Sequence, residues 1–148
     1  MEFPIKSGVL ITVLLILPNL VWMLLPKKPA APKASTPIAL TISEWVSRIA
    51  VFIIPLFYTI ELSKKFTAFA IAIMSLAIVI YYAAWIRYFI MGRTAKLFRA
   101  PFLGIPLPMA IAPVVFLILS SYILGSWPML AASICFGVFH IWISYKSL

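Results

Sequence analysis

Four polar side chains of this 148-residue chain lie in strongly apolar surroundings and could do chemistry there: Asn19, Arg48, Arg87 and His140. Ionisable groups inside a bilayer are costly, and they usually face the interior of a helical bundle or a water-filled cavity. The two arginines suit a phosphate or a carboxylate. His140 could exchange a proton near neutral pH, and Asn19 could both donate and accept hydrogen bonds. Together they predict a polar pocket for an anionic ligand.

Two aromatic side chains, Tyr81 and Trp85, could extend this pocket. Tyr81, Trp85 and Tyr88 recur at spacings of four and three, which places them on one face of a helix. Such a face could hold an apolar or planar ligand, and Tyr81 and Trp85 are therefore candidate binding residues. The alternative is an aromatic belt at a membrane interface, formed on one side by Trp22, Trp45, Trp85 and Trp142.

A purely structural interpretation of the same residues stays open. Arg48 follows Glu44 by four residues, so a salt bridge within one helix accounts for both, with Glu44 as a helix cap. Arg87 could snorkel to the headgroups. His140 is expected to face protein, because a helical repeat of spacing four, three and four brings it onto one face with three small residues: Ser133, Gly137 and Ser144.

Several chemistries are excluded by counts alone. The chain has no aspartate and three glutamates, so paired-aspartate catalysis is absent. One histidine and one cysteine, Cys135, cannot supply a four-ligand zinc site. The five glycines form no phosphate-binding or dinucleotide motif, and no nucleophile elbow occurs. We therefore predict no catalytic residue, no metal and no cofactor.

Composition indicates the class of protein that must position these residues. Apolar residues make up 65% and charged residues 10% of the chain, and the mean hydropathy is +1.15. A soluble domain carries about 45–50% apolar and about 25% charged residues. A membrane-spanning helix needs about 20 apolar residues. We predict an all-α, polytopic membrane protein, a single domain over 1–148 in which five transmembrane helices form a compact bundle: 8–25, 42–62, 66–91, 102–124 and 129–145.

Prolines define the segments between these helices. The first loop, 26–40, is proline-rich and should form a stiff, extended strap. The second helix starts either at 37, with Thr36 as the N-cap and Pro37 as the first helical residue, or at 41, from a Thr41-to-Glu44 capping box. Three prolines between 99 and 108 predict irregular backbone, with regular helix from Pro108.

Prolines inside the helices should free backbone carbonyls. Each interior proline removes one helical hydrogen bond, so Pro18, Pro55 and Pro113 should free the carbonyls of Leu14, Val51 and Met109. A freed carbonyl could bind a ligand or an ion. In most transmembrane helices a neighbouring group satisfies it, and this is the interpretation we prefer.

Basic residues predict the orientation. The loops on one side carry three lysines, whereas those on the other carry seven Lys and Arg. The positive-inside rule puts the larger group in the cytoplasm, so the N-terminus is outside and the C-terminus inside. The formal net charge of +9 then reflects basic loops at an anionic leaflet rather than nucleic-acid binding, for which no motif is present. A bacterial or archaeal plasma membrane is the expected location.

These features lead to two principal hypotheses of function. The first is a small membrane protein that binds or transports an anionic or amphipathic ligand, a lipid headgroup or a small carboxylate, through a polar pocket that faces the cytoplasm. The second is a structural or accessory subunit of a larger membrane complex, in which the polar residues join helices. A lipid-modifying enzyme with His140 as acid or base is weaker. Expected partners are membrane lipids, a small anion, and a second copy or another membrane protein.

Overall fold

The structure, a computed structural model, describes residues 8–26, 28 and 35–146. Within this part of the chain the fold is all-α, as predicted, and the only extended pairing is a single bridge between Phe102 and Ile105. Three of the basic residues counted for the orientation, Lys6, Lys27 and Lys33, and the proline-rich centre of the first loop lie outside the described residues. The elements are α1 (Gly8–Leu24), α2 (Ile38–Ile53), η1 (Ile54–Phe57), α3 (Thr67–Ile90), α4 (Ala95–Arg99), α5 (Pro108–Leu124) and α6 (Trp127–Lys146).

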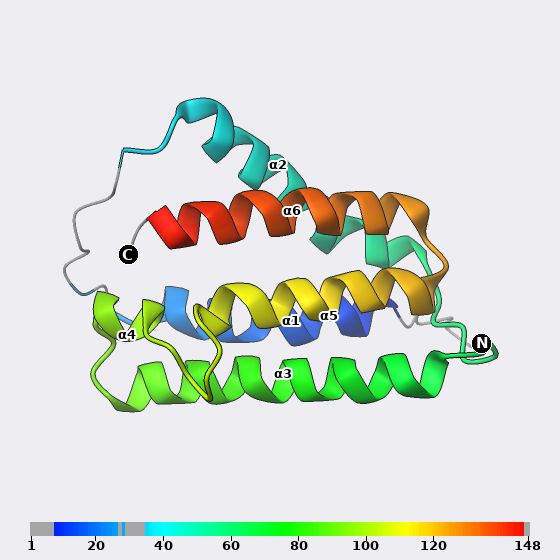
Figure 1. Ribbon diagram of the computed structural model, residues 1–148, viewed down its shortest axis with the longest axis horizontal. Helices are drawn as coiled ribbons and strands as arrows, with labels where there is room; N and C mark the ends of the chain where they lie inside the picture. The colour runs from blue at the N-terminus through cyan, green and yellow to red at the C-terminus, as the bar shows by residue number, and fades with distance from the viewer. Residues whose placement is uncertain (1–7, 27, 29–34, 147–148) are drawn as a thin grey trace.

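The long helices lie side by side in the order α3, α5, α6, α2 (Figure 1). The largest interfaces are α3 with α5, α5 with α6, and α6 with α2. Helix α1 packs against α3 and α5 and meets η1 near its first turn. In Figure 1 the first turns of α2 diverge from α6. The core lies mainly along α3 and α5, where twelve of the seventeen α5 residues are buried.

Three helical stretches are long and apolar enough to cross a membrane: Ile38–Phe57, Thr67–Ile90 and Trp127–Lys146. Helices α1 and α5 are also apolar but shorter, with 17 residues each. Large apolar side chains are exposed along α1, α2, α3 and α6, up to 86% at Leu24 and 77% at Ile90, whereas α5 exposes Tyr122 at 38%. Soluble monomers rarely expose apolar surface on this scale, so the helices are compatible with a location in a membrane.

Pro18 leaves the Leu14 carbonyl without its helical partner on the α3 side of α1. The Tyr82 hydroxyl donates to the Leu14 carbonyl at 2.7 Å, and the Tyr81 hydroxyl donates to the Leu15 carbonyl at 3.2 Å. The neighbouring helix therefore satisfies the Leu14 carbonyl that the sequence predicted to be free, and these bonds join α1 to α3.

Helix α2 differs from its prediction at both ends. It begins at Ile38, with Pro37 at the N-cap and no side-chain cap, so the start at 37 is close and the capping-box start at 41 is wrong. Its α-helical part ends at Ile53, well before the predicted 62. Pro55 lacks an N–H, and the chain tightens there into the 3-10 turn η1.

The segment between α3 and α5 contains the predicted irregular backbone. Regular helix begins at Pro108, as predicted, and positive φ angles occur at Leu103 (52°), Gly104 (76°) and Leu107 (50°). The short helix α4 was not predicted. Its first turn is capped by Thr94, whose hydroxyl accepts a hydrogen bond from the Leu97 amide at 3.3 Å.

The connections gather at two ends of the bundle. One end holds Gly8, whose amide donates to the Tyr58 carbonyl at 3.2 Å, and the segment at Glu61, whose amide donates to the Ile123 carbonyl at 2.8 Å. The other end holds the start of α2, the α3–α5 connection and the end of α6, which is Lys146 (Figure 1). Two hydrogen bonds join its loops: Lys28 Nζ to the Gly92 carbonyl at 2.5 Å, and Arg93 to the Pro26 carbonyl at 3.1 Å.

Candidate functional site

An ion-paired cluster of Glu44, Arg48 and His140 joins α2 to α6. Oxygen Oε1 of Glu44 accepts a hydrogen bond from Arg48 Nη2 and lies 2.9 Å from His140 Nδ1. Arg48 Nη2 and His140 Nδ1 are 3.4 Å apart. The Glu44 side chain is only 7% exposed, whereas those of Arg48 and His140 are 36% and 22% exposed. A buried carboxylate thus holds two partners that remain accessible. We call these three residues the ionic cluster.

Helix geometry explains why the cluster forms. Because α2 starts at Ile38, Glu44 lies about 9 Å and Arg48 about 15 Å along the helix from that end. His140 lies about 9 Å from the Lys146 end of α6, at a similar depth to Glu44. The predicted salt bridge between Glu44 and Arg48 is confirmed. The predicted cap role of Glu44 is wrong, because Glu44 is in the second turn of α2 and pairs across to α6.

Aromatic rings hold the two exposed members of the ionic cluster. The Phe136 ring stacks on the His140 imidazole, with centroids 4.7 Å apart and planes at 15°. The Arg48 guanidinium lies 5.6 Å from the centroid of Trp45 and 5.9 Å from that of Phe136. A cation near an aromatic face is attracted by the ring quadrupole. These contacts limit the positions that the guanidinium can take.

Asn19 and Tyr81 form a second polar pair, between α1 and α3. Asn19 Nδ2 donates to the Tyr81 hydroxyl and to the Leu15 carbonyl, both at 2.9 Å. The hydrogen bonds of the described residues thus join the predicted site residues in two separate pairs, Asn19 with Tyr81 and Arg48 with His140.

Arg87 lies apart from both pairs. It donates to three backbone carbonyls beyond α3: Pro101 at 2.8 Å, Ala100 at 2.9 Å and Leu97 at 3.3 Å. Its guanidinium also lies 4.9 Å from the Phe102 ring centroid. Arg87 thus binds the end of α4 and the turn that follows. The two arginines do not meet in one pocket.

The aromatic face of α3 is closed. Tyr81 is 4% and Trp85 3% exposed. Trp85 stacks on Phe89, with centroids 5.2 Å apart, and meets Tyr88 and Phe98 edge-on. The prediction of Trp85 as part of an interfacial belt is wrong, because these rings bury it. Trp22, Trp45 and Trp142 are exposed, as a belt requires.

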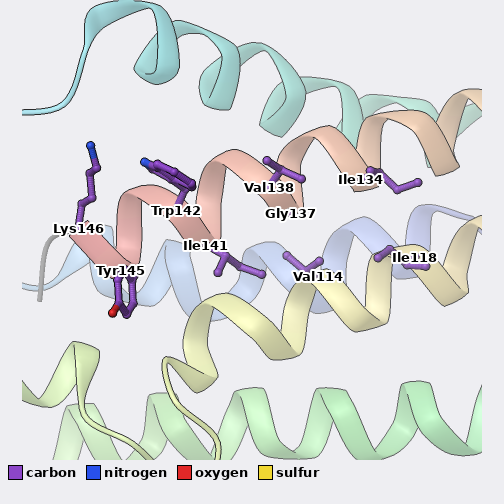
Figure 2. Close-up of a pocket in the computed structure, with 9 residues that line it drawn as sticks. All are labelled: Val114, Ile118, Ile134, Gly137, Val138, Ile141, Trp142, Tyr145 and Lys146. Atoms are coloured by element: carbon purple, nitrogen blue, oxygen red, sulfur yellow. The ribbon is translucent and has the colours of Figure 1, made fainter.

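An apolar groove of about 590 Å³ runs between α5 and α6. In Figure 2, Ile141 and Tyr145 point from α6 to the side of α5, whereas Lys146 and Trp142, at the same end of α6, point to the side of α2. The Lys146 ammonium is 5.6 Å from the Trp142 ring centroid. We call this surface the α5–α6 groove, and its lining residues are Val114, Ile118, Ile134, Gly137, Val138, Ile141, Trp142, Tyr145 and Lys146.

The groove involves residues that sequence reasoning missed. None of the six predicted binding residues lines it, nor do they line a second groove of about 400 Å³ between α2 and α6. The small residues Ser133 and Gly137 did indicate that another helix could approach α6 closely. The structure shows this approach, because an added Cβ at Gly137 would lie 2.7 Å from Val114 Cγ1. The groove also needs the divergence of α5 and α6 beyond this contact, which no local pattern predicts.

Comparison of this chain with protein-family models, with curated proteins and with solved structures finds no match.

Proposed function

We propose that this chain is an integral membrane protein that binds or carries an anionic amphipathic ligand, a membrane lipid with an acidic headgroup, in the α5–α6 groove. In this proposal all five long helices cross the membrane, with the N-terminus outside and the C-terminus in the cytoplasm. The ligand enters from the inner leaflet.

The α5–α6 groove is the observation that carries the proposal. Its walls are aliphatic along most of their length, which suits an acyl chain. Its Lys146 end combines a cation with Trp142 and Tyr145, the side chains that favour the level of the headgroups. The groove suits the apolar chain of such a ligand, and the Lys146 ammonium, which points to the α2 side of α6 in Figure 2, offers a positive charge to its anionic head at the same end of α6.

The distribution of charge supports the orientation. The described basic residues at the Lys146 end are Lys28, Arg93, Lys96, Arg99 and Lys146, whereas the opposite end has Lys64 and Lys65 beside Glu61. By the positive-inside rule the richer end faces the cytoplasm. Helices α1 and α5 would extend over about 25 Å each at 1.5 Å per residue, slightly less than the hydrocarbon core, so local thinning or the flanking segments would complete the crossing.

Native mass spectrometry tests the proposal directly. The protein is purified in mild detergent and mixed with phosphatidylglycerol or phosphatidylcholine. Val138 lines the groove and is 57% exposed, and Val138→Trp should fill the groove without entering the core. We expect this variant to retain much less phosphatidylglycerol. The matched control is Val79→Trp on α3, at 61% exposure, which should retain lipid as the wild type does.

The headgroup is tested with a second pair of variants. Lys146→Gln should lower retention of phosphatidylglycerol and leave phosphatidylcholine unchanged, because only the acidic lipid gains from the ammonium. Lys65→Gln, at the opposite end, is the control. Equal retention by the wild type, Val138→Trp and Lys146→Gln would overturn the proposal.

An accessory subunit is the second candidate, and the hydrogen bonds of Arg87 favour it. Arg87 binds three carbonyls of its own chain, so in this proposal its role is structural rather than ligand binding. In that function the α5–α6 groove receives an apolar helix of a partner protein. A stoichiometric partner that co-purifies with the wild type, and is lost in Val138→Trp, would support this candidate over lipid binding.

A further inference from the structure

The ionic cluster has a property that the groove does not explain. Glu44 is the one acidic residue in the helices of the described chain, and it lies in a segment apolar enough to span a membrane. Its negative charge is matched by the Arg48 guanidinium, while His140, which contacts the same oxygen, adds a positive charge only when it is protonated. The cluster can therefore exist in the membrane without net charge, and any added anion would break that balance.

The cluster also retains hydrogen-bond donors that the fold does not use. Among the described residues, the hydrogen bonds of Arg48 involve Nη2, which leaves Nη1 and Nε. His140 makes its contacts with Glu44 and Arg48 through Nδ1, so Nε2 has no partner in the cluster. A neutral ring that donates from Nδ1 has no hydrogen on Nε2, and Nε2 becomes a donor when the pair gains a proton. Both side chains are partly exposed. In an apolar medium an unpaired donor costs free energy, so the free nitrogens of Arg48 favour an acceptor that water cannot readily supply.

We propose that the ionic cluster binds a carboxylate anion together with one proton. The anion accepts from the free nitrogens of Arg48 and His140. One proton from the solution is taken up by the Glu44–His140 pair, on the carboxylate or on the imidazole, whose Oε1 and Nδ1 atoms lie 2.9 Å apart. Charge then stays balanced, because the new negative charge arrives with a new positive one. An anion without its proton would leave an uncompensated charge at low dielectric.

The groups that face the cluster leave few other places for that proton. From α2 the facing groups are Glu44 and Arg48, and from α6 the facing group is His140, with Lys146 at the end of the helix. From α3 the facing group is Tyr81, on which the Arg48 charge acts. Helices α1 and α5 contain no charged residue. A phenol and an arginine already carry their protons at neutral pH, so Glu44 and His140 are the acceptors.

Calorimetric titration with benzoate tests the inference. The protein is placed in phosphatidylcholine nanodiscs, with protein-free nanodiscs as the blank, over a series from about pH 5 to about pH 9, where the benzoate carboxyl is largely ionised. Uptake of one proton requires the Kd for benzoate to rise about tenfold per pH unit on the alkaline side of the series. Binding is therefore tighter at low pH.

Variants of the cluster separate the anion from the proton. In Glu44→Gln the Arg48 charge is no longer balanced, so benzoate binds without a proton. We expect a Kd that is tighter than wild type at high pH and independent of pH. Arg48→Gln should weaken binding by about tenfold or more at every pH. Glu61→Gln, outside the helices, is the control and should keep the wild-type slope.

Specific outcomes would overturn the inference. These are the absence of benzoate binding, a wild-type Kd that does not change across the series, and a Glu44→Gln variant that keeps the slope. Glu44→Gln is expected to bind benzoate, so its binding also shows that it is folded. The Val138→Trp variant should bind benzoate as the wild type does, because the α5–α6 groove is not part of this site. Failure of the groove proposal therefore leaves this inference standing, and the reverse also holds.

Discussion

At the scale of single residues, most buried polar atoms are satisfied locally, and close packing depends on small side chains. Ser120 and Ser133 donate to the carbonyls of Phe116 and Met129 on their own helices, both at 2.7 Å. Such bonds allow a serine to lie in an apolar interface without a partner from another helix. Gly137 then lets α6 approach Val114 on α5. This contact forms the floor of the α5–α6 groove.

A substitution at Gly137 tests this contact. An added Cβ would lie 2.7 Å from Val114 Cγ1, and Val114 is a stiff, buried β-branched residue. We expect Gly137→Ala to lower the free energy of unfolding in detergent micelles by about 1–3 kcal/mol. Val114→Ala should relieve part of this loss in the double variant, with a coupling of about 0.5–3 kcal/mol.

The control for this cycle is Ala131→Val, on an exposed face of α6, which should change stability little. Simple additivity of the Gly137 and Val114 substitutions would mean that α5 and α6 do not meet there.

At the scale of elements, Arg87 holds the unpredicted helix α4. The last carbonyls of a short helix have no partner within it, and Arg87 supplies donors to Leu97, Ala100 and Pro101 from α3. The segment 99–107 can therefore stay irregular and still pack on the bundle. The arginine that the sequence suggested as a ligand-binding residue fixes the connection between two core helices.

Replacing Arg87 with lysine should loosen this connection. Lysine keeps the charge but cannot reach three carbonyls with a planar fork. Hydrogen bonds to a charged group contribute about 1.5–3 kcal/mol each, so amide hydrogen exchange across 95–107 should speed up by about tenfold or more. Arg99→Lys, in the same segment, is the control. Unchanged exchange in Arg87→Lys would show that the segment is held by its apolar contacts instead.

At the scale of the whole molecule, the loops gather at two ends of the bundle, and one end carries more lysine and arginine residues than the other. The proposed orientation can be tested with single cysteines in a Cys135→Ala background. Lys65→Cys should react with a membrane-impermeant maleimide on intact cells, whereas Lys96→Cys should react only after permeabilisation. The opposite pattern would invert the protein, and labelling of both from outside would show that the two ends are not separated by a membrane.

The sequence alone determined the class of the fold and much of its layout. Continuous apolar runs favour helices that could lie in a membrane, since a helix satisfies every backbone group internally. The start of regular helix at Pro108 and the Glu44–Arg48 pair followed from local chemistry, because a proline or an i, i+4 spacing acts within one helix. The end of α2 at Ile53 was missed, although Pro55 was in view, because the degree to which a proline breaks a helix depends on its neighbours.

The tertiary structure decided which polar residues meet. No local pattern predicts that Glu44 meets His140, 96 positions away along the chain. Nor does one predict that Arg87 binds carbonyls at and after the end of α4 instead of sharing a pocket with Arg48. The rotation and divergence of packed helices set these pairings, and they depend on the whole interface. The α5–α6 groove has the same origin, because Gly137 brings two helices together and their divergence beyond that contact leaves the space.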